Sequence, residues 1–166
     1  MARSTVAVAT RTHASLTGVT TSTANVPDAL PSEDAVSATA LVAFDPGRHV
    51  GVAWVTAGGS LLASAVVSID DLGQIAVPTG ARVVLGDGTG SRALAAALGD
   101  LGLRPETVDE RGTSELARLL YWRRHPPRGM LRLVPVGLRV PPRPIDDFAA
   151  YAIALRALES AATREA

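Results

Sequence analysis

Two short apolar segments joined by a tight turn constrain the fold of this chain more than any other feature. The first covers residues 40–44 and ends at Asp45; the second is Val50–Val55, with Pro46-Gly47 between them. Apolar runs of this length on either side of a Pro-Gly turn predict a β-hairpin with buried strands at Leu41–Phe44 and Val50–Val55. The hairpin places the Asp45 carboxylate at the C-terminal end of a buried strand, where a ligand can reach it.

The rest of the sequence predicts alternating strands and helices. Further strands are expected at Leu61–Ser68, Arg82–Leu85 and Thr107–Asp109, and helices at Ser91–Leu101, from Thr113 to about Arg123, and from Ile145 to about Ala162; Ile69 to Ile75 is expected as a short helix or a loop. Three antiparallel strands followed by parallel strand–helix units predict the α/β class, with a five-stranded mixed sheet flanked by helices.

Residues 1–39 differ in composition from the rest of the chain. They contain 13 Ser and Thr, no acid before Asp28, and no sustained apolar period. We expect a disordered Ser/Thr-rich extension here; an organellar transit peptide and an upstream start codon are the alternatives. Residues 40–166 are long enough to form one domain with a sizeable core.

Composition excludes several kinds of site. The chain has no Cys, so a disulfide framework, a thiolate nucleophile and a cysteine-ligated zinc are excluded, and three His disfavour a His-rich transition-metal centre. No apolar stretch reaches the roughly 18 residues needed to cross a bilayer. We therefore expect a cytoplasmic protein that does not associate with membranes.

Basic residues are concentrated in one segment, although the net charge is zero. Eight arginines and a single acid, Glu115, lie between Arg111 and Arg143, and the part from Arg124 to Pro144 holds six prolines and two glycines. Such a segment predicts a long loop, often functional, whose positive field suits a phosphate backbone. A solvated surface in an Arg-rich composition is the alternative. The candidate nucleic-acid contacts are Arg48, Arg111, Arg123, Arg124, Arg128, Arg132, Arg139 and Arg143.

Acidic residues recur at the ends of the expected elements. Asp87 lies in the turn after the fourth strand, Asp109-Glu110 follow the fifth, and Asp146-Asp147 open the last helix. Each has a simpler reading as turn or helix-cap chemistry. Neighbouring helical residues point about 100° apart, so one acid of the last pair faces the sheet. Together with Asp45, the acids predict an oxygen-rich site for Mg²⁺ or Mn²⁺.

Three segments resemble, in order and spacing, the motifs of the YqgF/RuvC-like resolvases of the RNase H-like superfamily. They are Asp45-Pro46-Gly47 with Gly51-Val52-Ala53, residues 109–114 (DERGTS) and residues 145–150 (IDDFAA). Residues 121–129 and 141–144 look like a divergent bacterial branch described as pre-16S rRNA nucleases or Holliday junction resolvase-like proteins. The similarity covers about residues 40–160.

The resemblance implies an RNase H-like nuclease domain over residues 40–166 that acts as a Mg²⁺- or Mn²⁺-dependent endonuclease. Structured nucleic acid would be its substrate, either pre-16S rRNA during ribosome biogenesis or branched, Holliday-junction-like DNA, and the protein would be a monomer or a homodimer. It assigns catalytic roles to Asp45, Glu110 and Asp146, and metal ligation to Asp45, Asp87, Glu110, Asp146 and Asp147, the last as an alternative helix acid.

The sequence departs from the family pattern at two places, and other functions stay open. Asp87 has no counterpart in the usual YqgF pattern, although it matches the RuvC-type placement of an acid after the fourth strand. Gly112 replaces a bulky residue after the Asp-Glu-Arg. A catalytically inactive nucleic-acid-binding or ribosome-assembly module on the same fold is the main alternative. An actin-like phosphotransferase would need two domains and a longer chain. Trp122 is expected in the core, with base stacking as its other possible role.

Overall fold

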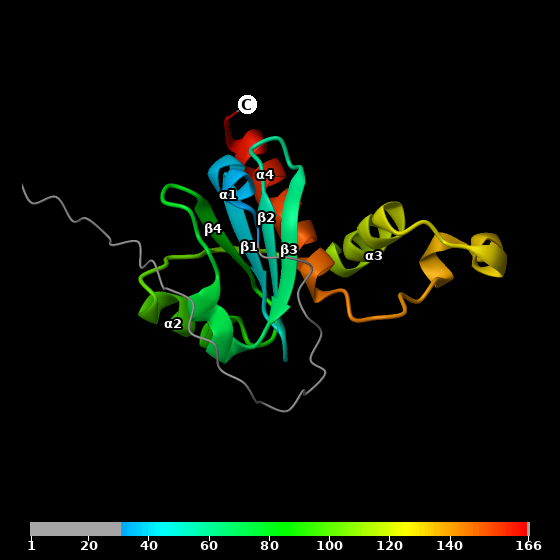
Figure 1. Ribbon diagram of the computed structural model, residues 1–166, viewed down its shortest axis with the longest axis horizontal. Coiled ribbons are helices and arrows are strands. Elements are labelled where there is room, and N and C mark those ends of the chain that lie inside the picture. Colours follow the sequence, from blue (N-terminus) through cyan, green and yellow to red (C-terminus); the bar gives the residue numbers. More distant parts are fainter. Residues whose placement is uncertain (1–30, 166) are drawn as a thin grey trace, which may run out of the picture.

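The computed structural model describes residues 31–165, so most of the expected N-terminal extension lies outside the described residues. Five strands form one sheet in the order β3-β2-β1-β4-β5 (Figure 1). β1 pairs antiparallel with β2 and β2 with β3, whereas β1 and β4, and β4 and β5, are parallel. The bounds are Leu41–Asp45 (β1), Val50–Val55 (β2), Leu61–Val67 (β3), Arg82–Gly86 (β4) and Glu106–Val108 (β5). The predicted fold class, a mixed five-stranded α/β sheet with an antiparallel meander and parallel strands, is confirmed and is consistent with an RNase H-like fold.

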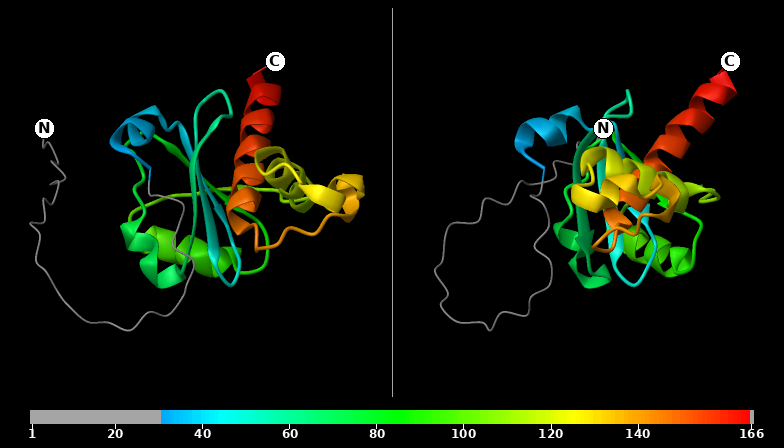
Figure 2. Two further views of the ribbon diagram at one scale, coloured as in Figure 1. Left: turned by 45° about the vertical axis from the view of Figure 1, so that its right-hand side comes forward. Right: turned by 90° about the vertical axis from the view of Figure 1, so that its right-hand side faces the viewer.

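Helices cover both faces of this sheet (Figures 1 and 2). They are α1 (Glu33–Ala38), α2 (Ser91–Asp100), α3 (Thr113–Arg124) and α4 (Asp146–Glu165), with short 3₁₀ helices at Ile69–Gln74, Gly129–Leu133 and Val136–Leu138. Within residues 31–165, no helix combines the length and the apolar character that a bilayer crossing requires.

The two faces of β1 bury different partners because side chains alternate along a strand. Leu41 and Ala43 pack with Ile153 of α4 in one cluster. Val42 and Phe44 point to the other face, where α2 and the 3₁₀ helix Ile69–Gln74 supply the partners. β1 is therefore buried on both sides, which explains its uninterrupted apolar sequence.

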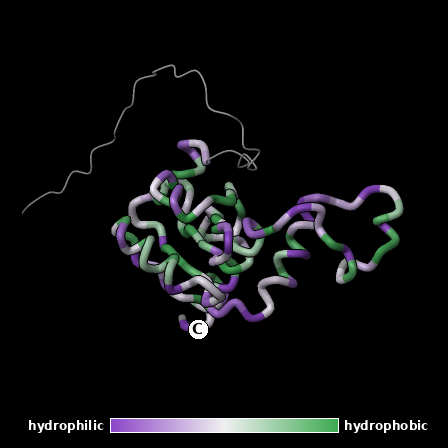
Figure 3. Tube along the Cα trace, turned by 90° about the horizontal axis from the view of Figure 1, so that it is seen from below, coloured by the Kyte–Doolittle hydropathy of each residue, from purple (hydrophilic) through white to green (hydrophobic). Residues whose placement is uncertain are grey.

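α3 packs mainly on α4. Tyr121 and Trp122 of α3 are buried against Phe148 and Ala152 of α4, so the expected core position of Trp122 is confirmed. The chain between the two helices, residues 125–144, projects away from the body (Figures 1 and 2). We call these residues the arm; Figure 3 shows hydrophobic and hydrophilic stretches alternating along it.

α1 forms where the sequence pattern predicts no regular element. The Ser32 hydroxyl accepts a hydrogen bond from the Ala35 N–H, and Glu33 and Asp34 occupy the first turn, where negative charge is favourable. None of the residues of α1 is buried. A helix held by its cap and not by an apolar face gives no periodic apolar signal in the sequence.

The start of α4 rests directly on the backbone of β2 at Gly51. A Cβ atom at this position would collide with the backbone carbonyl of Asp146 and would lie 3.1 Å from the Asp147 nitrogen. Register places Gly51 opposite Asp45 in the hairpin. The contact therefore sets how closely the first turn of α4 approaches the end of β1.

We expect Gly51→Ala to destabilise the protein by about 2–4 kcal/mol, since backbone and not a flexible side chain must move. Gly58→Ala is the matched control, because a Cβ there meets its first neighbour at 3.9 Å. Urea unfolding of the two variants measures the difference. Equal stability of both variants would contradict the close approach of α4 to β2.

Candidate functional site

Three of the predicted acids line one cavity of about 370 Å³. Asp45 ends β1, Glu110 follows β5 and Asp146 begins α4, so residues far apart in the sequence meet at one end of the sheet. The same cavity is also lined by Arg118 of α3 and by Val140, Pro141, Arg143 and Pro144 of the arm. The structure thus brings together the three residues assigned catalytic roles.

Asp45 lies in an unfavourable environment for a charged carboxylate. Its pKa is raised from 3.8 to about 7, first because the group is buried and then because of the negative charges of Glu110 and Asp146. A carboxyl with a pKa of about 7 is protonated in roughly half of the molecules at neutral pH. The cavity therefore favours a bound positive charge, either a proton or a cation.

Glu110 is held from both its backbone and its side chain. Its N–H donates to Asp87 Oδ1 at 2.9 Å, and its carbonyl accepts from the Thr113 hydroxyl at 2.7 Å. The carboxylate lies against Gly86 and Gly88, where a Cβ at either position would collide with it. Both glycines are required for this placement.

The Glu110 carboxylate is not fully satisfied. Oε1 is buried and has no hydrogen-bond partner among the described residues. Burial is the main cause that raises the pKa of Glu110; a hydrogen bond from the Gly88 backbone lowers it and the charge of Asp87 raises it. A buried carboxylate oxygen without a partner is costly and calls for a donor or a cation.

Asp146 occupies the first turn of α4. Burial raises its pKa most; the charge of His49 lowers it, that of Asp147 raises it, and that of Arg143 lowers it. The overall shift is upward, in the same direction as for Asp45 and Glu110. All three carboxyls that line the cavity therefore resist ionisation in the absence of a cation.

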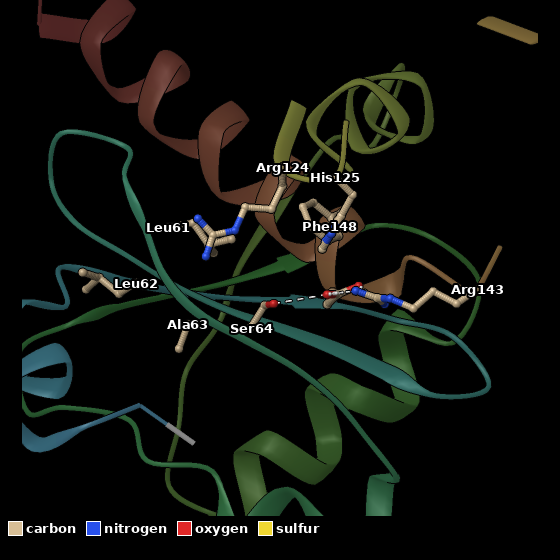
Figure 4. Close-up of a pocket in the computed structure, with 9 residues that line it drawn as sticks. Leu61, Leu62, Ala63, Ser64, Arg124, His125, Arg143 and Phe148 are labelled. Atoms are coloured by element: carbon tan, nitrogen blue, oxygen red, sulfur yellow. Dashed lines mark hydrogen bonds and ion pairs between the residues drawn. The ribbon is translucent and has the colours of Figure 1, made fainter. Parts of the chain in front are cut away.

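Asp147, the alternative helix acid, faces a different environment. It lines a second cavity of about 250 Å³, together with Ser64 and Arg143, which Figure 4 labels. Arg143 donates to both carboxylate oxygens at 3.0 Å, and the Ser64 hydroxyl donates to Oδ2 at 3.1 Å. Asp147 is only 5% exposed, whereas the Arg143 side chain is 33% exposed, so a buried carboxylate with its acceptors in use pairs with a half-buried guanidinium. The two neighbouring acids separate as helical geometry requires.

Asp87 supports the site through Glu110. It is an exposed residue whose Oδ1 accepts the Glu110 N–H. Asp109 acts similarly one step further on, because its Oδ1 accepts the Arg111 N–H at 2.8 Å. The acids around the β5–α3 turn therefore fix its backbone.

The predicted arginines occupy three kinds of position. Arg143 lines both cavities, and its guanidinium lies over the rings of Tyr121 and Phe148 at 5.6 and 5.8 Å. Arg139 donates to the carbonyls of Val134 and Arg132, within the arm. The remaining candidates are exposed: Arg48 in the hairpin turn, Arg111 after Glu110, Arg123 and Arg124 at the end of α3, and Arg128 and Arg132 in the arm.

Sequence reasoning missed two residues that border the acidic cavity, Ser114 and Arg118. They are four residues apart on α3 and therefore share a face of the helix. That spacing is a signal in the sequence, once the helix is known to face Asp45.

The donor set suits a hard divalent cation, although the acids do not close around one. Among residues 31–165, no three His, Cys, Asp or Glu side chains form a ready-made metal group. The cavity nevertheless offers three carboxylates as its acidic ligands, three upward pKa shifts, and the Oε1 of Glu110, which has no partner among the described residues. These features fit Mg²⁺ or Mn²⁺, whose preferred ligands are oxygens.

Comparison with known proteins identifies no relative from which the role of this cavity could be inferred. No protein-family model matches the sequence, and no curated protein matches it either.

We expect the stability of the metal-free protein to fall as pH rises from 5 to 8. Between pH 3.8 and about 7 the folded state holds a proton on Asp45 that the unfolded state has lost, so rising pH favours unfolding. Asp45→Asn removes this contribution. The difference in free energy of unfolding between Asp45→Asn and the parent should therefore shift by about 1–3 kcal/mol in favour of the variant when the pH is raised from 5 to 8. Urea unfolding in EDTA measures the slope, with Asp70→Asn, an exposed acid, as control. Identical slopes for Asp45→Asn and the parent would contradict the raised pKa.

We expect Arg143→Ala to cost about 3 kcal/mol, because it leaves the buried Asp147 carboxylate without its ion pair. Adding Asp147→Asn to that variant should recover at least about 1 kcal/mol, since the unpaired charge disappears. Arg82→Ala is the comparison, as its pair with Glu106 is solvent-exposed and should contribute less than about 1 kcal/mol. If thermal or urea unfolding gives Arg143→Ala and Arg82→Ala the same cost, the buried pair is not a stabilising contact.

Proposed function

We propose that this protein is a metal-dependent endonuclease of the RNase H-like type that hydrolyses phosphodiester bonds in structured nucleic acid. The observation that carries the proposal is the meeting of Asp45, Glu110 and Asp146 at one cavity that Arg118 and Arg143 also line. Acids and arginines that line one cavity suit a phosphate that binds between a cation and guanidinium groups. Pre-16S rRNA in the cytoplasm, or branched DNA, would supply such a substrate.

Asp45, Glu110 and Asp146 would hold Mg²⁺ or Mn²⁺. When bound, such an ion activates water and stabilises the departing 3′-oxygen. Asp45 carries a proton in part of the population at neutral pH, so it must release that proton before it can act as a ligand. Asp87 and Thr113 keep the backbone of Glu110 in place, which orients its carboxylate toward the cavity.

The arginines would bind the nucleic-acid backbone. Arg118 and Arg143 border the cavity itself, and the exposed Arg123, Arg124 and Arg128 extend the positive surface along α3 and the arm. Residues 116–145 contain seven arginines and no acid. Contacts of this kind position a strand without reading its bases, so binding should weaken with salt and show little sequence preference.

Asp45→Asn tests the proposal. Cleavage of labelled RNA and DNA substrates with Mg²⁺ or Mn²⁺ should fall at least about 100-fold, because direct ligands matter more than their supporting residues. Nucleic-acid binding should persist, and Asp70→Asn should behave as the parent. Mg²⁺ should raise the melting temperature of the parent but not of Asp45→Asn, which detects the ion without turnover.

Gly86→Ala provides a second test through Glu110. The added methyl group would occupy the place of the Glu110 carboxylate, which is the flexible end of a side chain and can move aside. Cleavage should fall about 10–100-fold while the melting temperature changes little. A parent protein that binds nucleic acid but cleaves none of the substrates would instead indicate the inactive binding or ribosome-assembly module.

A further inference from the structure

The second cavity, beside Asp147, has no part in the catalytic roles described above. It lies between the edge strand β3, the end of α3 and the start of α4 (Figure 4). Its polar lining is Ser64, Arg124, His125, Arg143 and Asp147, and Leu61, Leu62, Ala63 and Phe148 complete it. Three of these polar side chains, those of Arg124, His125 and Arg143, are basic and can donate hydrogen bonds to an anion.

The acid in this lining adds little net negative charge. The Asp147 carboxylate takes two hydrogen bonds from Arg143 and one from Ser64, so the Arg143–Asp147 pair is close to neutral toward a ligand. Arg124 then provides a full positive charge at the cavity, and it is exposed to solvent. Within the described part of the chain β3 pairs with β2 alone, so its outer edge carries further backbone N–H donors. The cavity favours an anion.

Two of the donors are held in place before a ligand arrives. The His125 ring lies against Tyr121 at 4.7 Å and against Phe148 at 5.9 Å between ring centroids. Arg143 is fixed by Asp147 and by the same two rings. Donors that are already ordered lose less entropy on binding, which favours a specific site over a diffuse positive surface.

The size of the cavity limits the ligand. Its volume of about 250 Å³ is below the roughly 300–1,000 Å³ of pockets that enclose drug-sized ligands. A phosphate group with part of its sugar suits this space better than a complete cofactor. The apolar residues Leu61 and Phe148 provide a surface for the uncharged part.

Arg143 joins this cavity to the three-carboxylate cavity, because it lines both. Asp146 and Asp147, consecutive residues of α4, face the first and the second cavity respectively. An extended polyanion bound at one cavity therefore passes close to the other. An acidic peptide along β3 would satisfy the same donors, but it would have no reason to continue toward three carboxylates.

We propose that the second cavity is a phosphate subsite of the nucleic-acid track. It holds, on Arg124, His125 and Arg143, a backbone phosphate of the same strand whose neighbouring phosphate lies at the three-carboxylate cavity. The proposal rests on the proposed function and adds to it a fixed point that determines which linkage along the strand reaches the acids.

A methylphosphonate walk tests the subsite. Single-stranded and branched oligonucleotides, each with one backbone phosphate replaced by the uncharged methylphosphonate, are titrated against the full chain carrying Asp45→Asn in EDTA, so that no cleavage occurs. One linkage next to the preferred cleavage position should lose about tenfold in affinity when neutralised, as expected for hydrogen bonds to a charged group. Adding Arg124→Gln and His125→Gln should abolish that sensitivity at this linkage only.

Matched variants separate a specific contact from general electrostatics. Arg124→Lys, which keeps the charge, should retain most of the sensitivity, and Arg92→Gln, an exposed arginine of α2, should leave the pattern unchanged. An Arg124→Gln/His125→Gln variant that weakens every linkage equally, or that leaves the sensitive linkage unaltered, overturns the subsite. So does binding of an acidic peptide that the double variant loses while nucleic-acid affinity stays constant.

Failure of the subsite and failure of the nuclease are distinguishable in these data. A linkage-specific pattern in a protein that never cleaves with Mg²⁺ supports the subsite and contradicts the proposed nuclease activity. Cleavage by the parent, together with a methylphosphonate series in which no linkage stands out, contradicts the subsite and supports the nuclease activity. A parent protein that binds no nucleic acid overturns both.

Discussion

The contact of the first turn of α4 with β2 at Gly51 determines where the functional groups of this protein lie. Since no side chain stands between the helix and the strand, the Asp146 backbone comes as close to the sheet as backbone atoms allow. Gly51 pairs with Asp45, so the same contact brings Asp146 toward the end of β1. The cluster Leu41, Ala43, Ala53 and Ile153 then fixes the rest of α4 against the sheet.

This packing makes the ionised carboxylates of the site energetically costly in the folded protein. Burial raises the pKa of all three carboxyls that line the cavity, and the charges of Glu110 and Asp146 raise that of Asp45 further. One oxygen of Glu110 has no partner within the described part of the chain. Next to Asp146, the more deeply buried Asp147 is paired with Arg143 through both of its carboxylate oxygens. The fold can therefore satisfy a buried acid where stability alone is at stake. Local conflict confined to one cavity is what a binding or catalytic site produces.

The strands were predictable to within one residue of their ends because apolar runs bounded by turn residues carry a local signal; β2 has the predicted bounds, and β1 extends by Asp45 alone. The meeting of Asp45 and Glu110 followed from strand order, since parallel strands share an end. Other features depend on contacts across the fold. The choice between Asp146 and Asp147 depends on the rotation of α4 over Gly51, and Arg143 finds Asp147 only because a long loop returns to α4. α1 has no buried residue, so its sequence lacks the periodic apolar pattern by which a helix is predicted.

The start of α4 combines opposite electrostatic tasks in two consecutive residues. Asp146 faces the acidic cavity, while Asp147 neutralises Arg143 and holds it between the two cavities. Moving the helix by one residue would exchange these roles, because adjacent positions point about 100° apart. The rotation of α4 therefore fixes both the third carboxylate and the arginine that borders it. The charge of the arginine held in this way also lowers the pKa of Asp146, so one guanidinium acts on both consecutive acids.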